Sequence, residues 1–163
     1  MNLAESLERG PHARLGAAVG RWAGTARLWL EPGNLFAEDT VTGEVASVGA
    51  GRWVRHDYAT RIDGTEHTGS VLLGFHIDDR GWQVAWVDTF HTGSAIMLSE
   101  GPLADDPEAP ISVLGSYGGG GDAGRWGWRT TFEIAGNRLL VRHHNITPSG
   151  EEALAVEFDY ERR

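Results

Sequence analysis

Asp88, His143 and His56 could act as acids, bases or ligands, and each stands in a stretch that otherwise reads as an apolar β-strand. Asp88 ends a series at a spacing of two residues that begins at Trp82 and includes Trp86. Side chains at this spacing point to one face of a strand. A polar group that is buried there without a partner costs about 1–3 kcal/mol. We therefore expect these groups to pair with one another, with water or with a ligand.

A two-residue turn at residues 136–137 predicts the partners of His143. This register sets Thr130 opposite His143 and Trp128 opposite Asn145, all on one face. If residues 147–150 form a loop, the next hairpin also places His143 on the inner face, opposite a leucine. The neighbouring His144 must then point outward, so the two imidazoles cannot hold one metal ion.

A four-residue loop at 78–81 sets Val71 opposite Asp88 and Leu73 opposite Trp86, again on one apolar face. The same register pairs Thr68 with His91 on the polar face, which predicts that His91 faces solvent.

A turn at residues 63–66 adds His56 and Tyr58 to the face of Val71. Several tryptophans around one cavity suit a flat or apolar ligand, and the polar groups would orient it. The candidate ligand-binding residues are His56, Tyr58, Trp86, Asp88, Trp128, Thr130, His143 and Asn145.

Turn residues recur along the chain from residue 20 onward and separate short β-rich runs. Thr42-Gly43 is taken as one of these turns. Even spacing without intervening helices predicts a sequential antiparallel meander that closes into a barrel, because an open sheet of this length leaves exposed edges. The expected strands cover residues 22–30, 41–48, 53–62, 71–77, 82–90, 96–98, 111–117, 126–134, 139–146 and 154–160. One short helix is expected within residues 1–19, and the barrel domain covers residues 20–163.

Composition excludes several classes of protein. The chain has 163 residues, which fits one domain, and a formal net charge of −9, which argues against binding to nucleic-acid phosphates. Cysteine and lysine are both absent. This excludes a thiol nucleophile, a Cys-ligated metal, Schiff-base chemistry and a P-loop lysine. No signal peptide or membrane span is recognisable, so the cytoplasm is the expected compartment.

The motif at residues 20–24, Gly-Arg-Trp-Ala-Gly, resembles the Gly-x-Trp-x-Gly start of lipocalin-like, or calycin, barrels. The span 20–163 also resembles a bacterial family of unknown function with a lipocalin-like barrel, through segments 51–54 with Tyr58, 73–75, 86–88, 150–152 and 157–162. That resemblance implies a closed β-barrel with a central cavity and no established activity. Nitrobindin-like barrels share the opening motif and bind haem through a late-strand histidine, a role that would fall to His143.

Four functions remain open at this point. The leading hypothesis is a module that binds a small apolar or aromatic molecule, with no cofactor. The second is a haem protein that uses His143. The third is a small enzyme with Asp88 and His143 as an acid–base pair. The fourth is a structural barrel that acts through its outer surface or as a homodimer, and neither nucleic acid nor a membrane is an expected partner.

Overall fold

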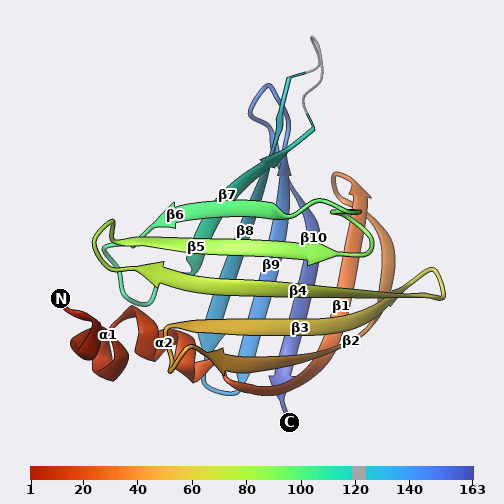
Figure 1. The fold of residues 1–163 in the computed structure, drawn as a ribbon. Helices are drawn as coiled ribbons and strands as arrows, with labels where there is room; N and C mark the ends of the chain where they lie inside the picture. The colour runs from red at the N-terminus through yellow and green to blue at the C-terminus, as the bar shows by residue number, and fades with distance from the viewer. Residues whose placement is uncertain (119–123) are drawn as a thin grey trace.

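The computed structural model describes residues 1–118 and 124–163 and shows a closed antiparallel barrel (Figure 1). Its strands follow one another around the barrel in chain order, and β1 closes against β10. The expected fold class is therefore confirmed. The strands are β1 (Gly20–Glu31), β2 (Asn34–Val48), β3 (Trp53–Ile62), β4 (Thr65–His76), β5 (Gly81–Asp88), β6 (Met97–Pro102), β7 (Ile111–Tyr117), β8 (Trp126–Ala135), β9 (Arg138–Ile146) and β10 (Glu152–Arg162).

The β8–β9 hairpin has the predicted register. Thr130 lies opposite His143 and Trp128 lies opposite Asn145. The prediction for the next hairpin was wrong by two residues, since Val156 lies opposite His143. The connection is one residue longer than expected, because Ile146 pairs with Glu152, and a bulge in β10 adds the second residue. His143 nevertheless stays on the inner face, since a shift by two residues preserves the face to which a side chain points.

The β4–β5 register was also wrong by two residues. Val71 lies opposite Trp86, and Gly69 lies opposite Asp88. The connection has the expected four residues but lies at 77–80 instead of 78–81, because β4 ends at His76 and β5 begins at Gly81. The inner face again keeps its apolar residues.

Strand β2 also departs from the prediction. The turn predicted at Thr42-Gly43 does not form, because both residues lie inside β2, where Gly43 pairs with Tyr58 of β3. Glycine is needed there for space, because a side chain at Gly43 would meet the buried rings of His56 and Tyr160. A side chain at Gly69, which pairs with the other side of Tyr58, would overlap the ring of Tyr58.

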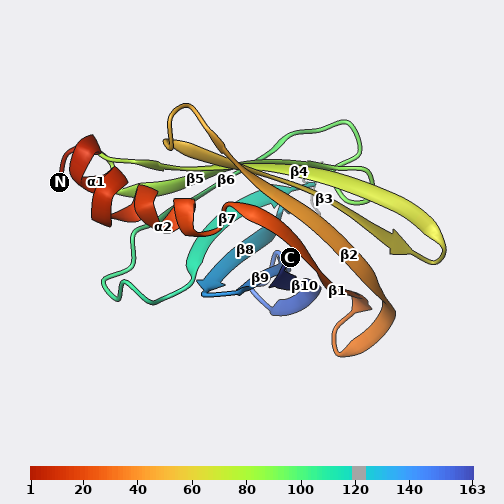
Figure 2. The same ribbon diagram turned by 90° about the horizontal axis from the view of Figure 1, so that it is seen from below.

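The N-terminal helix bends at Gly10 into α1 (Leu3–Arg9) and α2 (Pro11–Ala17) and closes one end of the barrel (Figure 2). Leu15 of α2 is fully buried in the core, and the carbonyl of Ala18 accepts a hydrogen bond of 2.9 Å from Nε1 of Trp22. Pro11 begins α2, where its missing N–H costs nothing. The opposite end carries the β1–β2, β3–β4 and β5–β6 connections and is called the open end below (Figure 1).

No helix in the described residues is both long and apolar enough to span a bilayer.

Candidate functional site

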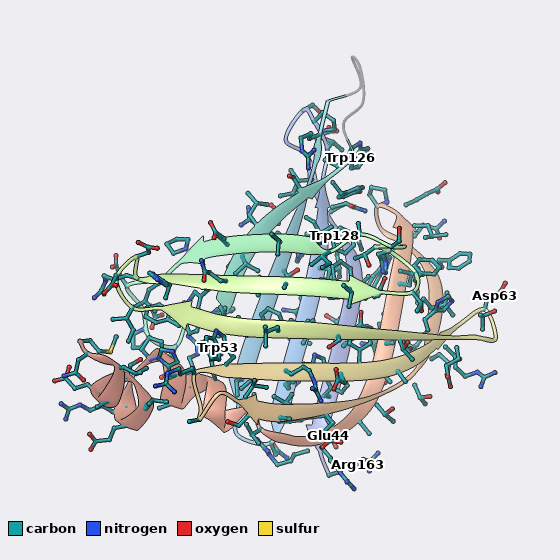
Figure 3. All side chains as sticks on the ribbon, viewed as in Figure 1. Glu44, Trp53, Asp63, Trp126, Trp128 and Arg163 are labelled. Carbon is teal, nitrogen blue, oxygen red and sulfur yellow. The ribbon has the colours of Figure 1, made fainter. Side chains whose placement is uncertain are left out.

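The eight candidate residues come from four strands whose inner faces meet inside the barrel. Seven of them are buried, and Asn145 is half-buried nearer the open end. In Figure 3, Trp128 lies within the barrel while Trp126 lies farther along β8, toward its projecting start. The buried seven are His56 and Tyr58 of β3, Trp86 and Asp88 of β5, Trp128 and Thr130 of β8, and His143 of β9.

Asp88 ends β5 and folds the chain that follows over the open end. Its Oδ1 accepts hydrogen bonds from the backbone N–H groups of Phe90 (3.0 Å), Thr92 (3.2 Å) and His91. Its Oδ2 accepts the hydroxyl of Tyr58 at 3.1 Å and lies 3.0 Å from Nδ1 of His91. One carboxylate thus accepts hydrogen bonds from five donors and ties the end of β5 to residues 90–92 of the β5–β6 connection.

The charge on Asp88 is maintained by these donors. Burial alone raises the pKa of Asp88, but the hydrogen bonds and charge of His91 and the backbone of Thr92 outweigh it and bring that pKa to about 2. Tyr58 responds in the opposite direction, since burial and the charge of Asp88 hold its pKa well above 10. The Tyr58 hydroxyl therefore stays protonated, donates to Asp88 and accepts the indole N–H of Trp86 at 2.9 Å.

His143 lies at the centre of an aromatic cluster. Its ring stacks on Trp86, with centroids 5.0 Å apart and planes at 15°, and Trp86 stacks on Trp128 at 5.4 Å. Nδ1 of His143 accepts the indole N–H of Trp128 at 3.2 Å and lies 2.9 Å from Oγ1 of Thr130. Burial lowers the pKa of His143 to about 3, so the imidazole is neutral near pH 7.

The other two candidates form separate contacts. Nε2 of His56 lies 3.2 Å from the hydroxyl of Tyr160, and burial lowers the pKa of His56 to about 4. Its ring also touches that of Tyr58, with centroids 5.5 Å apart. The side chain of Asn145 accepts a hydrogen bond of 2.6 Å from Tyr117 and makes none with the buried cluster in the described part of the chain. The structure thus brings seven candidates together and leaves Asn145 at the rim.

The prediction for His91 was wrong. Strand β5 ends at Asp88 rather than at residue 90, so His91 belongs to the β5–β6 connection and turns back over the cluster. Its ring lies 5.6 Å from that of Trp86 and 5.3 Å from that of Trp128. The sequence signal was Asp88 itself, because an aspartate followed within four residues by a threonine favours a turn that it caps.

Free space beside the cluster is small. The cavity bordered by Tyr58, Asp88, His91 and Phe158 measures about 20 Å³, which is room for about one water molecule. A second cavity of about 20 Å³ lies near His56, toward α2. The larger hollow, about 1020 Å³, is a shallow groove on the outer face of β1–β5. Aromatic side chains therefore occupy the interior around His143.

A family model described as "Protein of unknown function (DUF1579)" matches residues 8–162. The chain belongs to the DUF1579 family. No curated protein matches it. Membership thus agrees with the resemblance to a family of unknown function and assigns no activity to this DUF1579 barrel.

The residues of this DUF1579 chain do not fit a haem iron at His143. A histidine ligates through an unprotonated nitrogen. Nδ1 is engaged with Trp128 and Thr130, and in the neutral ring the proton then sits on Nε2. The cavity beside the cluster, about 20 Å³, is also far too small for a porphyrin. Within residues 1–118 and 124–163, moreover, no three His, Asp or Glu side chains are grouped as metal ligands.

Asp88 and His143 are also poorly suited to acid–base catalysis. Both oxygens of Asp88 already accept hydrogen bonds, and its pKa of about 2 makes it a weak base near pH 7. His143, with a pKa of about 3, is likewise far from the operating range of a general acid. The geometry of this DUF1579 site therefore does not favour proton transfer by Asp88 or His143.

Proposed function

We propose that this protein is a calycin-like barrel that binds a small apolar or aromatic molecule at its open end. The observation that supports this proposal is that Nε2 of the buried His143 is left without a hydrogen-bond partner in the described chain. This nitrogen is also not sealed away, since Nδ1 of His144 is the one side-chain N or O atom of the described residues that is both sealed from solvent-sized space and unpaired. An interior donor that lacks a partner is a feature that a ligand would complete. Neither small cavity beside the cluster is lined by His143, so a ligand would reach Nε2 only after the chain over the cluster moves.

Binding requires the β5–β6 connection, residues 89–96, to move. The ring of His91 covers the cluster, and the cavity beside it holds about one water molecule. Asp88 holds this segment through three backbone N–H groups. A ligand would take the place of the His91 ring and stack on Trp86 and Trp128, whose area supplies the affinity.

A neutral fluorescent probe tests the proposal. N-phenyl-1-naphthylamine is titrated into the purified protein and into the variants Trp86→Leu and Trp53→Leu. Trp53 lies on the outer face and is 43% exposed, so it is the matched control. We expect binding by the wild type and by Trp53→Leu, and about tenfold weaker binding by Trp86→Leu. No fluorescence change with the wild type, or equal weakening in both variants, would refute binding inside the barrel.

The small interior volume favours one competing function, a barrel that works through its outer surface. Exposed apolar side chains gather on the outer faces of β3 to β7, where a second copy of the chain could pack. This reading predicts no binding of the probe and a dimer in sedimentation equilibrium. The residues concerned are Trp53, Leu72, Leu98 and Leu114.

A further inference from the structure

The hydrogen bond from the indole of Trp128 fixes the tautomer of His143, that is, which ring nitrogen carries the proton. An indole N–H can only donate a hydrogen bond, and it is directed at Nδ1 of His143 at 3.2 Å. Nδ1 must therefore offer its lone pair. The hydroxyl of Thr130, 2.9 Å from the same atom, can donate to that lone pair as well. A neutral ring with an accepting Nδ1 is protonated at Nε2.

The unpaired nitrogen of His143 is consequently a hydrogen-bond donor. The buried polar side chains of the described chain include Asp88 but no arginine, and Asp88 already pairs with His91 at 3.0 Å. A carboxylate brought into this poorly solvated interior would lose its water shell without gaining a buried cation among the described residues.

We propose that the ligand is a neutral molecule with a hydrogen-bond acceptor, such as an aromatic ketone, whose oxygen accepts the N–H of Nε2 of His143. This inference rests on the proposed function and narrows its ligand class. Stacking on Trp86 would hold the aromatic part, while Nε2 would fix its orientation. Carboxylates and molecules without an acceptor would bind more weakly.

The protonated nitrogen can be observed without any ligand. Long-range ¹H–¹⁵N correlation spectra of the full-length protein separate protonated from unprotonated imidazole nitrogens. At pH 7 we expect His143 to show a protonated Nε2 and an unprotonated Nδ1. In Trp128→Phe the indole donor is gone, so the proton can move to Nδ1 and bond to Thr130; Trp126→Phe is the matched control, because its ring lies 37% exposed at the rim. A protonated Nδ1 in the wild type would overturn the inference.

Three probes of similar size test the ligand class. Acetophenone is neutral and has an acceptor, ethylbenzene is neutral and has none, and benzoate has acceptors and a charge. Their binding to the ¹⁵N-labelled protein is followed through the indole signals of Trp86 and Trp128. We expect acetophenone to bind about tenfold more tightly than either of the others. In His143→Phe the advantage of acetophenone over ethylbenzene should disappear.

The outcomes separate the two proposals. Binding of none of the probes, and of no N-phenyl-1-naphthylamine, would overturn the proposed function together with the ligand class. Equal binding of ethylbenzene and acetophenone would overturn the ligand class alone, as would equal binding of benzoate. A preference for acetophenone that survives in His143→Phe would show that another group supplies the donor and would also overturn the inference.

Discussion

Asp88 is the residue on which the order of the open end depends most directly. Two strands and the β5–β6 connection meet at its carboxylate, through the hydroxyl of Tyr58, the ring of His91 and three backbone N–H groups. Hydrogen bonds to a charged group contribute more than those between neutral groups, about 1.5–3 kcal/mol. The carboxylate is therefore a structural anchor, and it keeps His91 above the cluster.

Replacing this carboxylate by an amide tests that role. In Asp88→Asn the charge is lost and an amide N–H₂ group faces donors, so we expect the free energy of unfolding to fall by about 2 kcal/mol. Urea denaturation measures this change. Amide hydrogen exchange should also accelerate at Phe90, His91 and Thr92, since their N–H groups lose their charged acceptor.

Asp78→Asn is the matched control, because the side chain of Asp78 is exposed in the β4–β5 connection and makes no hydrogen bond with the described residues. Its free energy of unfolding should change by less than about 0.5 kcal/mol. Equal effects of the two substitutions would contradict the anchoring role of Asp88.

At the scale of elements, the two ends of the barrel are closed in different ways. Helix α2 closes one end of the barrel with the buried side chain of Leu15. Nη2 of Arg14 also donates a hydrogen bond of 2.6 Å to the carbonyl of Ala109 in the β6–β7 connection. The open end is covered by a connection that lacks regular structure and is held mainly by one carboxylate. Helical closure buries apolar area and is the more permanent, so we expect a ligand of the proposed kind to enter at the open end.

Truncation of the helical seal should destabilise the whole barrel. Leu15→Ala removes a fully buried side chain, and we expect the free energy of unfolding to drop by about 2–5 kcal/mol. Thermal or urea unfolding measures it. Leu30→Ala is the comparison, since Leu30 is 57% exposed and its loss should cost less than about 0.5 kcal/mol. A small effect at Leu15 would mean that α2 packs loosely on the barrel.

For the whole molecule, the buried histidines make stability depend on pH. Burial lowers the pKa of His56 to about 4 and that of His143 to about 3, from an ordinary value of 6.5 in the unfolded chain. Below pH 6.5 these two imidazoles bind protons in the unfolded chain but stay neutral in the folded barrel until the pH approaches their lowered pKa values. Stability is thus fully present above pH 6.5 and is lost as the pH falls toward 3.

Urea denaturation across this range should show the loss. Between pH 6 and pH 5 we expect these two imidazoles to reduce the free energy of unfolding by on the order of 2 kcal/mol. His143→Phe should show about half of this dependence, because one of the two titrating groups is removed. A free energy of unfolding that is flat between pH 6 and pH 5 would contradict neutral buried histidines.

The pattern of residues along the chain was enough to predict the fold class and which side chains of the strands point into the barrel. Period-two alternation and turn residues predict ten antiparallel strands, and the parity of side chains around His143 and Trp86 survives even where a register was wrong by two residues. Family membership agrees with the segments that carried the resemblance. Local pattern suffices here because alternation depends on neighbours along the chain.

The contacts and roles of the polar groups inside the barrel became visible only in the tertiary structure. The sequence could not show that Asp88 would cap a turn and draw His91 over the cluster, or that Trp128 would direct its N–H to Nδ1 of His143. It also could not show that aromatic rings would leave so little space beside them. These features depend on side chains from β3, β5, β8 and β9 meeting in three dimensions, and their distances are set by closure of the barrel.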